Sequence, residues 1–268
     1  MIPPTGRLKA KKRPFREIAF DMRHVVFSVI RERQVAAGKG ARALGTGFFV
    51  SPTVFITCDH VMNDPKDPHM DGDSYVLVAN LTGNTGTLYP VAHPKVGTDL
   101  FLFPNLDLAV LKVQAKNDQP YAALDYGDVY EGEDIGVSGY PIPELHVVNQ
   151  NLQLDGLVYR ASKGHVTGRY TANISNEIQN APIVEVNFLF VPGNSGGPVF
   201  SAETGRVIGF VRGFRYVKIW EDVATVTNIP QLPLGLGQQY IASMNAIYSL
   251  ALKLDFIRAT IEGFGASL

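Results

Sequence analysis

The chain has 268 residues, of which 46% are hydrophobic and 18% are charged, and its formal net charge is −1. This length suits one or two domains with a sizeable core. The balanced charge gives no global attraction to nucleic acid or to an anionic membrane, and we expect neither as a partner. No run of about 20 apolar residues is present, so no transmembrane helix is predicted.

The single cysteine, Cys58, excludes an internal disulfide. Disulfides are typical of small secreted domains, and no charged-then-apolar signal peptide opens the chain. These two observations predict a cytoplasmic protein. We expect Cys58 to pack as a small apolar residue, and a reactive thiol is the alternative.

Residues 1–22 form a basic N-terminal extension, in which the first acidic residue is Glu17. A solvated, mobile tail is the simplest interpretation. An electrostatic arm for an acidic partner or nucleic acid is the alternative, although Phe15 is the only aromatic residue among the first sixteen. The basic residues are Arg7, Lys9, Lys11, Lys12, Arg13 and Arg16.

Short apolar runs separated by turn residues then predict β-strands. We expect strands at residues 24–30, 45–50, 53–57, 75–81, 87–92 and 107–113, and again at 134–139, 158–170, 183–190, 198–200, 207–217 and 240–244. The turn-rich segment 116–133 is expected to join the two halves.

The last part of the chain has a different spacing. Apolar residues stand at Ile247, Leu250, Leu254, Ile257 and Ile261. This spacing is close to helical and predicts a C-terminal helix over about residues 246–262. Many short strands and one terminal helix predict an all-β fold of two packed antiparallel six-stranded barrels, over about residues 23–120 and 130–245.

Ser195 lies in a glycine-rich turn, with Gly193 and Gly196 on either side. Glycine adopts backbone angles that other residues resist, so the N–H groups of Gly193 and Ser195 can point into the space beside the serine hydroxyl. Two such donors would form an oxyanion hole. An ordinary surface turn is the alternative.

A nucleophilic serine needs a base, and the base needs an orienting group. His60 follows an apolar strand-like run. Asp107 precedes another such run, and an unpaired charge among its apolar neighbours would be costly. Asp99 and Asp125 are rival orienting acids. The order His, Asp, Ser is one of three known triad orders.

The segments around these residues, 55–61, 106–113 and 192–198, resemble the conserved boxes of the trypsin-like serine peptidases, and most closely those of the HtrA-type bacterial branch. The resemblance covers about residues 25–262. It implies a chymotrypsin-like fold and a serine endopeptidase that needs no cofactor or metal. His60 would be the base, Asp107 the orienting acid and Ser195 the nucleophile.

Three features bear on how far the resemblance extends. Cys58 and Asp59 replace the small or amide residues usual before the histidine, and no PDZ-like segment is recognised. Asn194 carries no charge to pair with a new N-terminus, which implies folding without propeptide removal. An activating partner or oligomer is left open.

The resemblance also indicates where a polypeptide substrate would bind. The primary pocket would be lined by Leu189 and by the strand Phe210, Val211, Arg212 and Gly213. Leu189 stands where the trypsin branch places an acid, so we expect an apolar residue on the acyl side of the cut. The substrate backbone would add as a strand to residues 211–213.

Other interpretations remain. The acidic loop 63–73 would be a candidate metal site, but its spacing does not match an EF-hand and we predict no metal. A catalytically silent binding module and an esterase using the same triad are the alternative functions.

Overall fold

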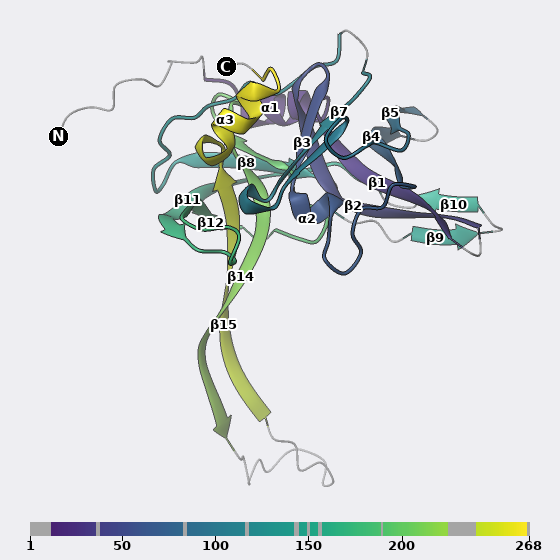
Figure 1. Ribbon diagram of the computed structural model, residues 1–268. Helices are drawn as coiled ribbons and strands as arrows, with labels where there is room; N and C mark the ends of the chain where they lie inside the picture. Colours follow the sequence, from purple (N-terminus) through teal and green to yellow (C-terminus); the bar gives the residue numbers. More distant parts are fainter. Residues whose placement is uncertain are drawn as a thin grey trace.

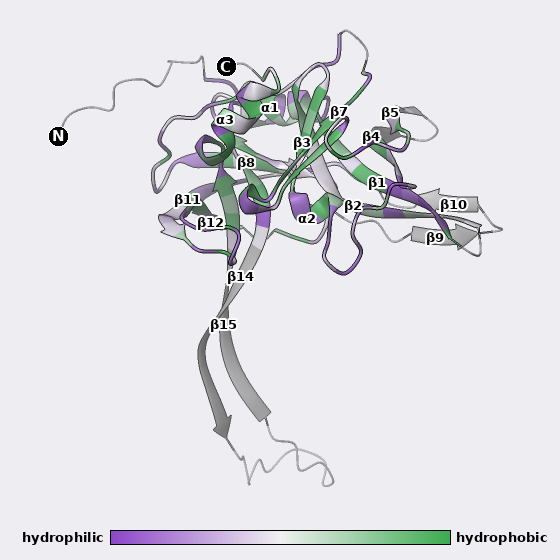
Figure 2. Cartoon of the chain, viewed as in Figure 1, coloured by the Kyte–Doolittle hydropathy of each residue, from purple (hydrophilic) through white to green (hydrophobic). Residues whose placement is uncertain are grey.

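The computed structural model describes residues 12–35, 38–82, 85–115, 118–141, 145–148, 151–154, 157–188, 190–224 and 240–266. Figure 1 shows a body built from β-strands with short helices against it, and a long hairpin that projects from the body. Hydrophobic residues gather along the strands of the body, for example in β3 and β7 (Figure 2).

The first half of the chain forms a seven-stranded antiparallel sheet in the order β5-β4-β1-β2-β3-β7-β6. Its centre is aromatic: the rings of Phe27, Phe49, Phe55 and Tyr89 pack with centroids 5.2 to 6.4 Å apart. The strands are β1 (Val26–Val35), β2 (Gly38–Ser51), β3 (Val54–Thr57), β4 (Ser74–Thr82), β5 (Thr85–Val91), β6 (Leu100–Phe103) and β7 (Leu108–Lys112). Helix α2 (Asp59–Met62) follows β3, and the 3-10 helix η1 (Pro104–Leu106) precedes β7.

The second half closes into a six-stranded barrel in the order β11-β12-β15-β14-β13-β8. Its strands are β8 (Asp134–Gly139), β11 (Arg160–Ala172), β12 (Ala181–Val186), β13 (Pro198–Ser201), β14 (Val207–Ala224) and β15 (Tyr240–Lys253). Strands β9 (Leu145–Val148) and β10 (Asn151–Leu154) pair with each other in a separate two-stranded sheet.

The closed barrel has the six strands that the sequence predicts, whereas the first unit has seven strands and is not closed in the part of the chain that the structure describes. The additional strand is β6. Its apolar run is only four residues long, too short to show a strand period.

The helix predicted over residues 246–262 is wrong for its first half. Residues 240–253 form β15, and the chain then makes the 3-10 helix η2 (Leu254–Ile257) and the short helix α3 (Arg258–Gly263). At residues 249–252, β15 pairs with β12 on one side and β14 on the other. This pairing overrides the near-helical spacing of the apolar residues.

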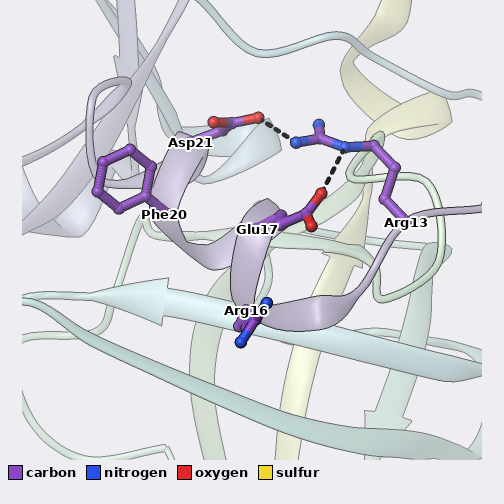
Figure 3. A pocket seen from close by; sticks show the side chains of 5 residues that line it. All are labelled: Arg13, Arg16, Glu17, Phe20 and Asp21. Atoms are coloured by element: carbon purple, nitrogen blue, oxygen red, sulfur yellow. Dashed lines mark hydrogen bonds and ion pairs between the residues drawn. The ribbon is translucent and has the colours of Figure 1, made fainter.

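The N-terminal extension is not a solvated tail over the residues that the structure describes. Helix α1 (Phe15–Met22) buries Ile18 and Met22, and the Phe15 ring stacks on Phe200 of the barrel at 6.1 Å. Figure 3 shows Arg13 paired with Glu17 and Asp21 on the same helix, so part of the basic charge is balanced locally. Residues 1–11 lie outside the described residues.

Strands β14 and β15 continue far beyond the barrel as a two-stranded arm (Figure 1). Among the described strands, only their bases have other partners: β13 pairs with residues 207–210 and β12 with residues 249–252. At the base of the arm Val211 is opposite Ala251 and Gly213 is opposite Leu250, so Arg212 is an extra residue in a β-bulge.

None of the helices in the described part of the chain has the length and apolarity that crossing a bilayer requires.

Candidate active site

His60 is placed by the end of β3. All four residues of this strand are buried, and the chain turns directly into α2, whose second residue is His60. Its Nδ1 lies 2.9 Å from Asp107 Oδ1 and 3.0 Å from Asp107 Oδ2, and its backbone N–H donates to Oδ1 at 3.2 Å. Because an ionised carboxylate only accepts, a neutral His60 carries its proton on Nδ1 and leaves Nε2 as the basic nitrogen.

Asp107 lies between η1 and β7 in the left-handed backbone conformation, with φ 46°. Aspartate tolerates this conformation better than most residues. Its side chain is 3% exposed and its carboxylate faces His60. The rival acids lie elsewhere: the carboxylate of Asp99 accepts from the Lys95 N–H, and that of Asp125 accepts from the Gly127 N–H.

Ser195 stands at the junction of two successive turns. The Asn194 N–H donates to the Val191 carbonyl at 3.1 Å, and the Gly197 N–H donates to the Asn194 carbonyl at 2.9 Å. The third residues of these turns are Gly193 and Gly196, with φ 95° and 83°, as a type II turn requires. Neither the Gly193 N–H nor the Ser195 N–H donates to an acceptor among the described residues.

A single carbonyl joins the histidine segment to the serine loop. The Val211 carbonyl oxygen accepts from the Gly196 N–H at 2.8 Å and from the Cys58 thiol at 3.3 Å. Gly196 follows Ser195, and Cys58 lies two residues before His60. The structure has no hydrogen bond between His60 and Ser195, both of which it describes. Such bonds are often long in ligand-free enzymes.

Thr46, on β2, ties the first sheet to the serine loop. Its N–H donates to the Ser195 carbonyl at 2.9 Å, and its hydroxyl donates to the Gly193 carbonyl at 2.6 Å. The same hydroxyl oxygen accepts from the Tyr140 N–H at 2.9 Å. The loop is therefore fixed by both halves of the molecule.

The two residues before His60 are buried and electrostatically coupled to Asp107. Burial, reinforced by the charge of Asp107, raises the pKa of Asp59 to about 6, and Asp59 Oδ1 has no hydrogen-bond partner. Burial also raises the pKa of Cys58 well above that of an ordinary thiol, again with Asp107 adding to the effect. A fully buried, protonated Cys58 agrees with the interpretation as a packing residue.

The ligand atoms of Cys58, His60 and Asp107 lie within 4.8 Å of one another and are the candidate metal ligands of the described chain. The cysteine is held as a thiol and the histidine Nδ1 faces the carboxylate, so this set does not fit a metal well. Two carboxylates of the acidic loop form ion pairs with arginines from outside it. Asp67 pairs with Arg31, Arg33 and Arg42, and Asp73 pairs with Arg33. That no metal is needed stays a prediction.

The predicted substrate-binding residues divide into two groups. The side chains of Phe210 and Val211 are buried in the core. Arg212 and Gly213 line a cavity of about 370 Å³. Its other lining residues are Tyr170, Ala172, Asn173, Ile174, Ile183 and Leu250. Leu189 lies outside the described residues.

Arg212 makes a contact that the sequence does not reveal. Its Nε lies 3.3 Å from Asp107 Oδ2, on the carboxylate that faces His60. In the sequence, the one signal is a cation at the end of the apolar run 207–211, where a substrate contact is the simpler interpretation.

Two proteins named as probable periplasmic serine endoproteases, DegP-like, are similar in sequence. The one from Pseudomonas fulva (strain 12-X) is 30% identical over 171 residues, covering 63% of this chain and 29% of the relative. The one from Pseudomonas savastanoi pv. phaseolicola (strain 1448A / Race 6) is 31% identical over 184 residues, covering 66% and 31%. The chain therefore spans about three tenths of the length of these curated relatives.

Solved structures show the same fold. The active form of the Rv3671c protease from M. tuberculosis is 17% identical, with a TM-score of 0.57 over 100% of this chain and 96% of the other. The HtrA-type protease AlgW with a decapeptide is 14% identical, with a TM-score of 0.59 over 93% of this chain and 68% of the other. The predicted all-β, chymotrypsin-like fold class is confirmed.

The predicted cytoplasmic location is contradicted, because the similar Pseudomonas proteins are named periplasmic. The physical basis of the prediction was weak. A lone cysteine cannot form an internal disulfide in any compartment, so it does not distinguish a reducing compartment from an oxidising one.

The model of the trypsin-like peptidase domain matches residues 45–210, which is more than half of the chain and includes His60, Asp107 and Ser195. The names of the relatives agree with the predicted enzyme class, a serine endopeptidase, and with the HtrA-type branch. The chain belongs to the trypsin-like peptidase domain family.

Proposed function

We propose that the chain is a serine endopeptidase that hydrolyses peptide bonds through an acyl-enzyme on Ser195. One observation carries the proposal. The His60–Asp107 pair and the loop of Ser195 come from different halves of the molecule, and the Val211 carbonyl accepts from Cys58, two residues before His60, as well as from the Gly196 N–H of the serine loop. An ordinary surface turn would not need this support.

In the proposed mechanism, His60 Nε2 takes the proton of the Ser195 hydroxyl as Ser195 attacks the substrate carbonyl. Asp107 holds the imidazole with its proton on Nδ1 and stabilises the imidazolium that forms. His60 then gives the proton to the leaving amine. Water, activated by the same histidine, releases the acyl group and regenerates Ser195.

The N–H groups of Gly193 and Ser195 would stabilise the oxyanion of the tetrahedral intermediate. The two turns would hold both N–H groups in place before substrate binds, so little reorganisation of the backbone would accompany the reaction. Removal of one such donor typically lowers the rate about 100- to 1000-fold.

The proposed substrate is a polypeptide with an apolar residue on the acyl side of the cut. One of the similar solved structures is an HtrA-type protease with a decapeptide. A substrate strand would pair with residues 211–213, beside the cavity of about 370 Å³. If Leu189 lines the primary pocket, Leu189→Asp changes the side-chain preference measured with a peptide library. An unchanged preference refutes this assignment.

We also propose a periplasmic location, on the names of the curated relatives alone. Cell fractionation with compartment markers tests it.

The first experiment is labelling with a fluorophosphonate probe, with the adduct located by mass spectrometry. We expect a single adduct on Ser195 of the native protein, and none in Ser195→Ala, His60→Ala or the urea-unfolded wild type. Ser201→Ala, at the end of β13, is the matched control and labels normally. A native wild type that forms no adduct refutes the proposal. Turnover of an ester without turnover of a peptide assigns an esterase instead.

A further inference from the structure

We propose that Arg212 is a positioning residue for the catalytic pair, and that its charge extends activity to lower pH by offsetting part of the charge of Asp107. The inference rests on the proposed function of His60 and Asp107. It gives Arg212 a role beyond contact with substrate.

The backbone directs the Arg212 side chain toward the His60–Asp107 pair. Arg212 is the extra residue of the bulge at the base of the arm, between Val211 and Gly213. A bulge re-aims a side chain relative to the regular alternation of a strand. Here the guanidinium is directed to Asp107, and Nε lies 3.3 Å from Oδ2.

The two carboxylate oxygens have different surroundings. Oδ1 accepts from the His60 backbone N–H and faces Nδ1, while Oδ2 faces both Nδ1 and the Arg212 guanidinium. Arg212 Nε is buried and makes no hydrogen bond in the described structure, so the contact is an ion pair without hydrogen-bond alignment. Among the described residues, its ion-pair partner is Asp107.

The charge of Arg212 has a predictable effect on catalysis. An imidazolium at His60 is stabilised by Asp107, and a cation beside the same carboxylate offsets part of that stabilisation. Activity therefore extends to a lower pH with Arg212 present than without it. Arginine stays charged at every relevant pH and is the only one of these groups that cannot lose its effect by titration.

The other groups that face the pair are few. Asp59 lies on the same helix as His60, and Glu177, from the segment between β11 and β12, acts on Asp59. Cys58 precedes the helix and is held protonated by burial. The charge of Asp59 favours the imidazolium, whereas Arg212 is the described cation that an ion pair places on Asp107.

The test compares three variants in kcat/KM against pH, with an apolar peptide substrate. Arg212→Gln removes the charge and keeps amide donors; we expect the acid limb to move to higher pH by about one unit. This shift is about a tenfold loss one unit below the wild-type midpoint. Arg212→Lys keeps the charge and leaves the limb in place. Arg206→Gln, just before β14, removes an arginine that pairs with no described carboxylate and changes neither limb nor plateau.

If the acid limb of Arg212→Gln coincides with that of the wild type, the proposal is overturned. If the acid limb of Arg212→Lys moves as far as that of Arg212→Gln, the charge of Arg212 is not responsible. The titration of the His60 ring, followed by ¹H–¹⁵N NMR and assigned with His60→Ala, is a second measurement. It responds to Arg212 even if Ser195 forms no adduct, so failure of this inference and failure of the proposed function remain distinguishable.

Discussion

Asp59 is a buried acidic residue whose surroundings disfavour its negative charge. Its side chain is buried, Oδ1 has no hydrogen-bond partner, and the charge of Asp107 is close enough to raise the pKa further. A buried carboxylate without a partner costs stability when it ionises. At neutral pH, the residue directly before His60 therefore carries a negative charge that destabilises the folded state.

Asp59→Asn should stabilise the protein at neutral pH. An unfolded aspartate titrates near pH 4, whereas burial raises the pKa of Asp59 to about 6 in the folded chain. Between these values the folded state binds more protons, so stability falls as pH rises, and above pH 6 the loss is on the order of 2–3 kcal/mol. Urea unfolding should show this gain for the variant at pH 7.5 and none at pH 4. The exposed Asp118→Asn is the control. Equal stability of variant and wild type at pH 7.5 contradicts the prediction.

Gly196→Ala should destabilise the protein and remove labelling of Ser195. Gly196 has φ 83°, and an added Cβ would collide with the Thr46 carbonyl oxygen and the Thr57 hydroxyl. We expect a loss of at least about 2 kcal/mol in unfolding free energy. Gly72→Ala is the matched control, because no atom lies within 4 Å of its added Cβ and its φ is not positive. A variant as stable and as reactive as the control would refute the need for glycine.

At the scale of elements, α1 shows what composition cannot predict. Six basic residues suggest a solvated segment, yet the helix has an apolar face that covers the second barrel. The Tyr159 hydroxyl donates to the Ala19 carbonyl at 2.9 Å, and the Arg13 N–H donates to the Glu203 carbonyl at 2.8 Å. Residues 12–22 are therefore part of the folded unit.

Ile18→Ala should be costly and Phe20→Ala should not. Ile18 is 1% exposed and Phe20 is 58% exposed on the same helix. Truncation of a buried isoleucine typically costs 2–5 kcal/mol, roughly, whereas an exposed site costs about 0.5 kcal/mol. Chemical denaturation of both variants measures the difference. Similar costs for the two variants would mean that α1 does not contribute to the core.

The elements that the sequence predicts well are those with local signals. Residues 53–57 and 107–113 are apolar runs bounded by turns, and β3 and β7 lie there. The end of β15 could not be predicted, because its strand state comes from pairing with β12 and β14, which are distant in sequence. The contact between Arg212 and Asp107 could not be predicted for the same reason, because the bulge that turns Arg212 toward Asp107 forms only when β14 and β15 pair.

At the scale of the molecule, the candidate site depends on contacts that neither half makes alone. His60 and Asp107 lie next to strands β3 and β7 of the first sheet, whereas Ser195 precedes β13 and Arg212 lies in β14 of the barrel. Motif order predicts His60, Asp107 and Ser195, and the structure shows which contacts hold their segments together. Thr46 is central, since one hydroxyl serves both the Gly193 carbonyl and the Tyr140 N–H. The activity should therefore be more sensitive to this residue than its distance from the chemistry suggests.

Thr46→Val should separate activity from folding. Valine keeps the shape of threonine but leaves the Gly193 carbonyl without its donor and the Tyr140 N–H without its acceptor, both in buried surroundings. Each orphaned group costs about 1–3 kcal/mol, and the Gly193 turn is no longer fixed. We expect Ser195 labelling to slow at least about tenfold at a temperature where circular dichroism shows a folded variant, because one oxyanion donor loses its orientation. Thr46→Ser keeps the hydroxyl and should label within about threefold of the wild type, since donor and acceptor are both retained. If valine and serine variants label at the same rate, the hydroxyl does not hold the loop, and the two halves of the molecule are joined for stability alone.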